Sequence, residues 1–269
     1  MIAVLDELRG WLLDVSGDMD SSPKSDGTPV TFADREVDRI LTERLADRFP
    51  GHGVLSEEQQ TRAPETEWTW IVDPIDGTSN FTARLPYWCI SIALACNGTP
   101  VLGIIDAPVL GSRYSATLGG GATVETRTTS LAGRSDQPRR RPLRVRGEVA
   151  WWDRRNRHIP VMLTTGTARR ARAAGVRLNA RVMGSVALDL AAVADGVAAA
   201  SIAMVPRVWD IAAGSLLVTE AGGSVVTVDG DPLLPMRPGV EQQPRSAVTA
   251  AGPNERYTRQ FAERLLADR

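Results

Sequence analysis

Acidic residues stand at the ends of several expected secondary-structure elements in this chain. They are Glu57 and Glu58 after the short apolar stretch GVLS, Asp73 and Asp76 at the end of the apolar strand WIVDPID, and Asp210 at the start of a helix after SIAMVPRV. Element ends are where a rigid scaffold gathers reactive side chains. Carboxylate ligands without His or Cys select hard cations, so this set predicts a Mg²⁺ or Mn²⁺ site rather than a zinc site.

The spacing of Asp73 and Asp76 brings two like charges together. Such a pair is costly unless a cation lies between the carboxylates or one of them takes up a proton. Pro74 fixes its backbone φ angle and stiffens the turn, so both carboxylates can converge on a cation. We expect bound metal to offset the repulsion.

Gly77 and Thr78 follow the two aspartates directly. If DGTSNF begins a helix, the free N–H groups of its first turn form an anion site, and Gly77 allows close approach of the backbone. Metal ions beside a helix N-terminus predict a phosphate ester as substrate, with cations stabilising the attacking and leaving oxygens during hydrolysis.

The charge balance of the chain limits its partners. Its 269 residues include 31 Lys and Arg against 32 Asp and Glu, for a formal net charge of −1, so no overall field attracts nucleic acid or an anionic membrane. The first residues, MIAVLDELRGWLLDV, carry charges within an apolar pattern of helical spacing and predict an amphipathic helix rather than a signal peptide or membrane span. We expect a small-molecule partner and neither nucleic acid nor membrane.

The two cysteines of the chain, Cys89 and Cys96, lie in one strand-like run, YWCISIALAC. Their odd spacing points them to opposite faces of the strand, which argues against a disulfide. The cytoplasm, which is reducing, is therefore the expected location.

The remaining elements predict two lobes. After a second helical pattern through Val37 and Leu45, four strands (WTWIVD, YWCISIALAC, PVLGIIDAP and SRYSATL) follow one another without helices, which predicts an antiparallel sheet. Periodicity is lost over residues 126–147, where the basic run at 139–141 is expected to be a solvated loop. Helices and strands alternate beyond this point. We therefore expect an N-terminal lobe, residues 1–145, and a C-terminal α/β lobe, residues 146–269.

Several motifs of the chain resemble those of one known family. VLSEEQ, WIVDPIDGTSNF and VWDIAAGSLLVTEAGG resemble the inositol monophosphatase family of Mg²⁺-dependent, lithium-sensitive phosphatases. PVTFAD (29–34) and MGSVALDLAAVADG (183–196) resemble further blocks of that family, so the likeness runs from about residue 20 to 265. The resemblance implies a layered αβαβα sandwich with an α/β arrangement, and the homodimer that is usual in the family.

The resemblance also implies a set of metal ligands. Glu57, Asp73 and the backbone carbonyl of Ile75 would bind a first Mg²⁺. Asp73, Asp76 and Asp210 would bind a second, and Glu57 would help to hold a weaker third ion through water. Two or three ions per site are thus expected, with Mn²⁺ as a possible substitute.

Catalytic and substrate-binding roles follow from the same resemblance. Asp34 and Thr78 would form a hydrogen-bonded pair that orients and deprotonates the attacking water, beside Glu57, and the N–H groups of Gly77 and Thr78 would hold the phosphate. Asp76, Asp210 and Ser185 are expected to lie against the substrate. Lys24 would belong to a mobile flap.

Several of these residues also have a purely structural interpretation. Asp34 stands three residues after Thr31 and could cap the second helix, and Asp210 could be a first-turn acid matched to a helix dipole. Ser185 would by default be the N-cap of a helix. Lys24, in a loop of Ser, Asp and Gly, could simply be solvated.

Two departures from the family bear on the substrate. An acidic residue seven positions before the aspartate of the WD pair commonly contacts an inositol hydroxyl, but this chain has Ala203 there, whose methyl group cannot accept that bond. Residues 126–180, which carry part of the leaving-group pocket in the family, are hard to align. We expect a small polyol phosphate such as myo-inositol monophosphate. Histidinol phosphate, a bisphosphate nucleotide and fructose 1,6-bisphosphate stay open, as does a relative that binds metal and sugar phosphate without turnover.

Overall fold

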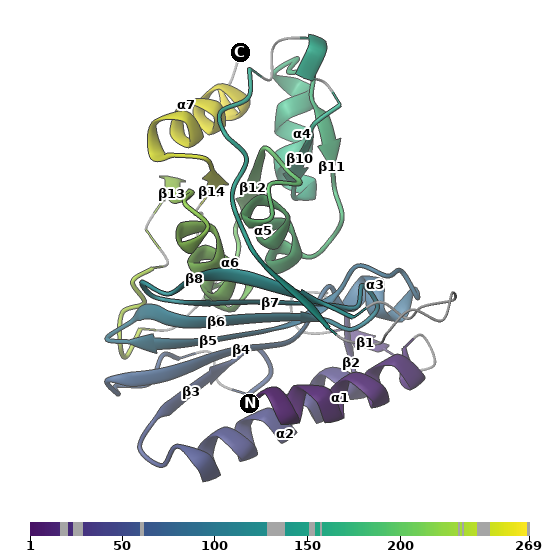
Figure 1. The fold of residues 1–269 in the computed structure, drawn as a ribbon, viewed down its shortest axis with the longest axis vertical. Helices are drawn as coiled ribbons and strands as arrows, with labels where there is room; N and C mark the ends of the chain where they lie inside the picture. Colours follow the sequence, from purple (N-terminus) through teal and green to yellow (C-terminus); the bar gives the residue numbers. More distant parts are fainter. Residues whose placement is uncertain are drawn as a thin grey trace.

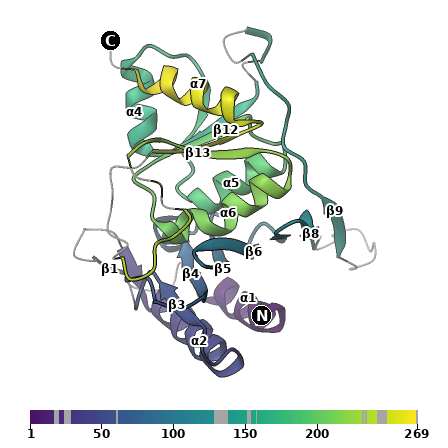
Figure 2. The ribbon, with the colours of Figure 1, turned by 90° about the vertical axis from the view of Figure 1, so that its left-hand side faces the viewer.

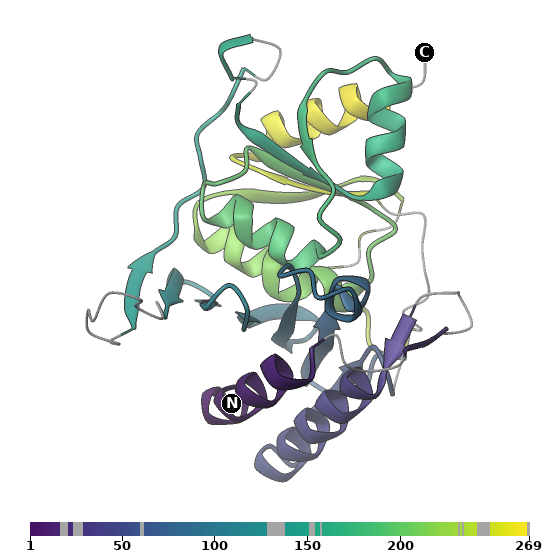
Figure 3. The ribbon, with the colours of Figure 1, turned by 90° about the vertical axis from the view of Figure 1, so that its right-hand side faces the viewer.

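Helices and sheets alternate in five stacked layers (Figure 1 and Figure 3). The computed structural model describes residues 1–16, 21–23, 29–59, 62–127, 138–150, 154–156, 158–230, 232, 234–240 and 248–267. The layers are, in order, α1 (Ile2–Val15) with α2 (Phe32–Arg48), a seven-stranded sheet, α5 (Val186–Ala194) with α6 (Val208–Glu220), a five-stranded sheet, and α4 (Thr165–Ala173) with α7 (Glu255–Leu266). The predicted layered αβαβα sandwich is confirmed.

The seven-stranded sheet follows the order of the chain. Its strands are β3 (Gly53–Ser56), β4 (Trp68–Asp76), β5 (Cys89–Cys96), β6 (Thr99–Ala107), β7 (Ser112–Thr117), β8 (Gly121–Thr126) and β9 (Arg139–Pro142). β3 runs parallel to β4, and each later strand is antiparallel to its predecessor. The antiparallel sheet predicted from the run of strands is confirmed.

The basic run at residues 139–141 forms β9, so the prediction of a loop was wrong there. Arg139 is paired with Thr126 of β8, and the whole strand is exposed at the end of the sheet (Figure 2). Charged side chains suit an edge strand because they discourage pairing with other chains. Arg141 also forms a two-pronged ion pair with Asp195 at the end of α5.

The first helix layer covers one face of this sheet. The apolar face of α1, including Leu5, Leu8 and Leu12, packs with that of α2 against Trp70 and Ile92. The amphipathic helix predicted at the N-terminus is therefore confirmed.

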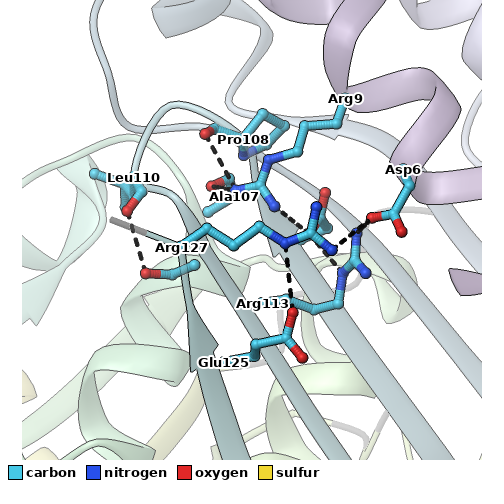
Figure 4. Close-up of polar contacts among 10 residues, drawn as sticks. Asp6, Arg9, Ala107, Pro108, Leu110, Arg113, Glu125 and Arg127 are labelled. Atoms are coloured by element: carbon cyan, nitrogen blue, oxygen red, sulfur yellow. Dashed lines mark hydrogen bonds and ion pairs between the residues drawn. The ribbon is translucent and has the colours of Figure 1, made fainter. Parts of the chain in front are cut away.

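Ion pairs tie α1 to the end of the same sheet (Figure 4). Arg113 donates from Nε to Asp106 Oδ1 and from Nη2 to Asp6 Oδ1, both at 2.8 Å. Arg9 donates to the carbonyl of Ala107 at 3.4 Å. Arg113 and Asp106 are buried, so these bonds fix the orientation of α1 in a setting that water screens weakly.

The five-stranded sheet belongs to the second half of the chain. Its order is β11 (Asn179–Arg181), β10 (Pro160–Leu163), β12 (Ala200–Met204), β14 (Val248–Gly252) and β13 (Ser224–Asp229). β10 is parallel to both neighbours, whereas β14 is antiparallel to β12 and β13. The smaller elements are β1 (Ser21–Pro23), β2 (Pro29–Thr31), α3 (Thr78–Thr82) and a 3₁₀ turn at Arg154–Asn156.

The central helices α5 and α6 lie between the two sheets (Figure 2). Their buried residues, such as Leu188 and Leu216, form one apolar cluster with Ile71 and Ile105 of the seven-stranded sheet. Residues from both halves thus share a core, and the division into lobes 1–145 and 146–269 stays a prediction. Of the helices in the described ranges, none combines the length and apolarity that crossing a membrane demands.

Candidate active site

Asp73 and Asp76 lie on the same face of β4 because the strand is irregular between them. Asp73 is paired with Ser91 of β5 and Asp76 with Cys89, so three steps along β4 match two along β5. Residues three apart in a regular strand would point to opposite faces, and one extra residue, as in a β-bulge, restores the shared face. Pro74, which has no N–H to donate to the ladder, suits such a position.

This shared face is directed toward the central helices. Ser91 donates a hydrogen bond to the carbonyl of Trp209 in α6 at 3.3 Å, and Cys89 Sγ lies 3.8 Å from Ser185 Oγ. Asp73 and Asp76 lie directly opposite Ser91 and Cys89 in the pairing of β4 with β5. The two aspartates therefore face the layer that carries Asp210.

Asp76 is held by the start of α5. Its Oδ2 accepts hydrogen bonds from Ser185 Oγ at 2.6 Å and from the Ala187 backbone N–H at 2.7 Å. Burial raises the pKa of Asp76 to about 6, although these two hydrogen bonds act in the opposite direction. Ser185 also caps α5 by accepting from the Leu188 N–H at 3.3 Å, so the predicted N-cap is confirmed.

Asp73 is almost completely buried. Only 1% of its surface is exposed, and its Oδ1 has no hydrogen-bond partner among the described residues. Burial raises the pKa of Asp73 well above its usual value, and the charges of Glu57, Asp76 and Asp210 raise it further. A buried, unpartnered carboxylate oxygen is costly in itself.

Glu57 and Asp210 reach the same region from other elements. The Glu57 N–H donates to the carbonyl of Val72 at 3.2 Å, which places Glu57 beside Asp73. Asp210, in the first turn of α6, accepts from the Arg207 N–H at 2.8 Å. Burial and the charge of Asp76 raise the pKa of Asp210 well above normal. The structural interpretation of Asp210 as a first-turn acid is therefore confirmed. Asp210 also lies close enough to Asp76 for their charges to interact.

The donor set fits a hard cation. It consists of oxygens alone, and the unpartnered Asp73 Oδ1 is a ligand atom with no other role. Within the described ranges, no three acidic, His or Cys side chains form a ready-made metal cluster. Carboxylates repel one another unless a cation lies between them. The donor set is therefore matched to a hard cation by its chemistry, and not by the distances between the carboxylates.

Asp34 divides its two carboxylate oxygens between two elements. Oδ2 accepts from the Thr31 N–H at 2.8 Å in a capping box at the start of α2, and Oδ1 accepts from Thr78 Oγ1 at 2.9 Å. Burial raises the pKa of Asp34 against the effect of the hydrogen bonds from Thr31 and Thr78. The capping interpretation is confirmed, and the predicted pairing of Asp34 with Thr78 is present as well.

Thr78 Oγ1 has a second acceptor, the carbonyl of Ile75 at 3.1 Å. A hydroxyl has one hydrogen to donate, so a cation on the Ile75 carbonyl would leave that hydrogen to Asp34. The side chain of Ile75 is buried in the opposite direction, with the α1 and α2 cluster.

Gly77 begins α3 with a left-handed φ of 100°. A Cβ atom there would lie 3.0 Å from the carbonyl oxygen of Tyr87, so both the backbone angle and the lack of space favour glycine. The helix predicted to start at DGTSNF is confirmed as Thr78–Thr82.

Asn80 joins the two halves of the site, which the sequence analysis did not anticipate. Its Nδ2 donates to the carbonyls of Tyr87 and Met183, each at 2.7 Å. The second bond holds the segment that leads to Ser185. The only available signal was the position of Asn80 inside the DGTSNF motif, because an amide in a short helix has no distinctive pattern.

Other expected residues lie elsewhere. Lys24 falls outside the described residues. Ala203 is buried in β12, in register with Thr249 of β14. His52, one of the two histidines of the chain, stacks between Phe49 and the tryptophans of β4 and therefore has a structural role.

Comparisons with known proteins place these features in context. The model of the inositol monophosphatase family matches residues 3–266. A histidinol-phosphatase of Mycobacterium tuberculosis is 35% identical over 216 residues, which cover 79% of each chain. An inositol-1-monophosphatase of Mesorhizobium japonicum is 36% identical over 214 residues, covering 78% of this chain and 76% of the relative. The crystal structure of the extragenic suppressor protein suhB from Bartonella henselae superposes with a TM-score of 0.74 at 26% identity, covering 99% and 98% of the two chains.

Proposed function

Because this chain belongs to the inositol monophosphatase family of metal-dependent phosphoric monoester hydrolases, we propose that it releases phosphate from a small polyol phosphate, such as myo-inositol monophosphate, with Mg²⁺. The observation that carries the proposal is the irregularity in β4, which turns Asp73 and Asp76 to one face and leaves Asp73 Oδ1 without a donor. Such a pair of carboxylates is a ligand set for Mg²⁺.

The proposed ligands are Glu57, Asp73, the Ile75 carbonyl, Asp76 and Asp210. Two or three ions are proposed per site. When bound, Mg²⁺ would supply positive charge that stabilises the attacking and leaving oxygens of the ester. The hydrogen bonds from Ser185 and Ala187 to Asp76 Oδ2 leave its other oxygen to face the site.

Asp34 and Thr78 are the proposed base. A water hydrogen-bonded to Thr78 Oγ1 can pass its proton to that oxygen while the threonine proton moves to Asp34 Oδ1, 2.9 Å away. Thr31 holds the other Asp34 oxygen in place. The raised pKa of Asp34 makes it a better proton acceptor than an ordinary aspartate.

The start of α3 is proposed to hold the phosphate. Its first backbone N–H groups, at Gly77 and Thr78, precede the helix hydrogen bonds that Asn80 and Phe81 donate to the Gly77 carbonyl. Donors aimed at a developing negative charge stabilise the transition state.

Histidinol phosphate is the second candidate substrate. The histidinol-phosphatase relative is 35% identical to this chain and the inositol-1-monophosphatase relative 36%, so similarity favours neither ester. Ala203 removes one acceptor for an inositol hydroxyl in the pattern of the family, which adds weight to the alternative.

Phosphate release from a panel of esters tests the proposal. The panel contains myo-inositol 1-phosphate, histidinol phosphate, fructose 1,6-bisphosphate and a bisphosphate nucleotide, each with Mg²⁺ and with EDTA. We expect Mg²⁺-dependent release from myo-inositol 1-phosphate, and preference for another ester would reassign the substrate. Failure of every ester would contradict catalysis, and an Asp76→Asn variant of undiminished activity would contradict the metal assignment.

Lithium sensitivity, self-association and location are further parts of the proposal. Millimolar Li⁺ should inhibit release by taking the second metal position, and unchanged rates would exclude that position for Li⁺. A homodimer is expected by analytical ultracentrifugation. Cytoplasmic location stays a prediction from the two unpaired cysteines.

A further inference from the structure

Asp38 is a buried carboxylate that the proposed reaction does not use. It stands one helical turn after Asp34 on α2, so the two side chains leave the same face of the helix. Asp34 is 1% exposed and Asp38 is 0% exposed. Asp34 accepts from Thr78 at the start of α3, whereas Asp38 Oδ1 accepts a hydrogen bond from Ser56 Oγ at the end of β3. One face of α2 therefore contacts both of these elements.

The Ser56 hydroxyl also holds the turn that follows β3. Its oxygen accepts from the Glu58 backbone N–H at 3.3 Å, in a turn that serine side chains commonly form. The hydroxyl has a single hydrogen. Because Asp38 accepts that hydrogen, the lone pairs of the oxygen are left to the Glu58 N–H. Ser56 is only 1% exposed, so water competes little for either bond.

Glu57 lies between the two residues that this turn joins. Its own N–H donates to the carbonyl of Val72 at 3.2 Å, so hydrogen bonds fix the backbone at Glu57 and directly after it. The path from Asp38 through Ser56 therefore ends at a proposed metal ligand.

The Glu57 side chain lies near every other carboxylate of the site. Burial is the main cause of their raised pKa values, and the charge of Glu57 raises each pKa further, in Asp34, Asp73, Asp76 and Asp210. Charge interactions weaken with distance. A displacement of the Glu57 backbone would therefore change its relation to all four carboxylates at once.

We propose that Asp38 and Ser56 are a positioning pair, in which the Asp38 carboxylate orients the Ser56 hydroxyl and this hydroxyl fixes the turn that presents Glu57 to Mg²⁺. Both residues act through Glu57 and not on the substrate. The inference rests on the proposed function, because it concerns the placement of a proposed Mg²⁺ ligand.

Mg²⁺ binding to the full chain, measured by isothermal titration calorimetry without substrate, tests the pair. Ser56→Ala should weaken binding about tenfold, at the lower end of the effect of partners that orient a metal ligand. Asp38→Ala should have a similar effect, and the double variant should be no weaker than either single variant, because both substitutions remove one bond. Fully additive losses would overturn the pairing, and Ser56→Ala alone tests the positioning role if Asp38→Ala does not fold.

A second cycle tests whether the effect passes through Glu57. In a Glu57→Gln background, Ser56→Ala should cause no further loss of Mg²⁺ affinity. An unchanged affinity in Ser56→Ala, or the same tenfold loss in the Glu57→Gln background, would overturn the positioning role while leaving the proposed function in place. Wild-type protein that binds no Mg²⁺ would overturn the proposed function and this inference with it.

Thr66→Val is the matched control. Thr66 Oγ1 accepts from the Gly53 N–H at 3.1 Å, at the opposite end of β3 from Ser56. Its loss should lower the Tm without changing the Mg²⁺ affinity. Equal losses of affinity in Thr66→Val and Ser56→Ala would show that any damage to β3 weakens the site, which would also overturn the specific role of the pair.

Discussion

Ser185 Oγ donates a hydrogen bond of 2.6 Å to Asp76 Oδ2 across 109 residues of sequence. The donor precedes α5 and the acceptor ends β4, so this bond connects the central helix layer to the seven-stranded sheet. The same hydroxyl accepts from the Leu188 N–H and caps α5. One side chain therefore fixes both a helix end and a proposed metal ligand.

Replacing Ser185 by alanine should affect stability and metal dependence together. We expect Ser185→Ala to lose about 1–2 kcal/mol of unfolding free energy, because a helix cap and a buried hydrogen bond disappear. The Mg²⁺ concentration for half-maximal activity should rise, since Asp76 is no longer held. Asn254→Ala, which removes the cap of α7, is the control and should lower stability without changing the Mg²⁺ requirement. Equal Mg²⁺ requirements in both variants would show that Ser185 acts only as a cap.

Asp73→Asn should stabilise the metal-free protein while abolishing activity. The substitution removes a buried charge that four neighbouring carboxylates oppose. It also removes a metal ligand. The Tm measured in EDTA should rise, and the gain in Tm on adding Mg²⁺ should largely vanish. Asp195→Asn serves as control, because Asp195 is paired with Arg141 instead of with other acids. That control should retain the Mg²⁺ response, and a lower Tm for Asp73→Asn in EDTA would contradict the expected strain.

The hydroxyl of Thr78 should matter more than its methyl group. Thr78→Val removes the donor to Asp34 Oδ1 and should lower kcat by roughly 10²–10⁴-fold, the usual contribution of general acid–base catalysis. Thr78→Ser keeps the hydroxyl and should retain most of the activity. Steady-state kinetics with saturating Mg²⁺ measures both variants, and equal kcat values for them would exclude a role for the hydroxyl.

Protons should compete with Mg²⁺ near pH 6. Burial raises the pKa of Asp76 from 3.8 to about 6 in the folded protein. Between pH 3.8 and about pH 6, the folded, metal-free chain therefore binds more protons than the unfolded chain. The stability that this proton binding contributes is lost as the pH rises through 6. Mg²⁺ requires the ionised carboxylate, so the increase in Tm caused by Mg²⁺ should grow over the same interval. Melting curves from pH 5 to 8, with EDTA and with MgCl₂, measure the effect. If the rise in Tm caused by Mg²⁺ does not vary with pH, the expected competition between protons and Mg²⁺ is contradicted. In Asp76→Asn, the pH dependence centred on pH 6 should be absent.

Local features of the site could be predicted from the sequence better than its long-range contacts. The cap at Ser185, the first-turn position of Asp210 and the helix after Gly77 depend on neighbours within a few residues, and each is present. The contact between Ser185 and Asp76 could not be predicted, because periodicity reports which face of an element is buried and not which segment covers it.

The hydrogen bonds of Asn80 and the strand β9 could not be predicted from the sequence either. Asn80 reaches Met183, 103 residues away, and nothing in its immediate surroundings distinguishes it from a solvated amide. β9 carries arginines in place of an apolar pattern, since an exposed edge strand is held by backbone pairing with β8 and by polar contacts such as that of Arg141 with Asp195, not by apolar packing. Amino-acid composition predicts such a strand poorly, because backbone pairing holds it in the sheet.

The irregularity at Pro74 and Ile75 has a consequence for how this protein can change. Deleting one of these two residues would restore the regular pairing of β4 with β5 and leave Asp73 and Asp76 two residues apart on one face, but it would remove the bulge in which the Ile75 carbonyl accepts from Thr78 instead of pairing with β5. A deletion of this kind removes no acidic residue and alters no charge. In this region the number of residues, more than the identity of any side chain, determines whether an evolving or engineered variant keeps a backbone carbonyl free of the sheet beside the two aspartates.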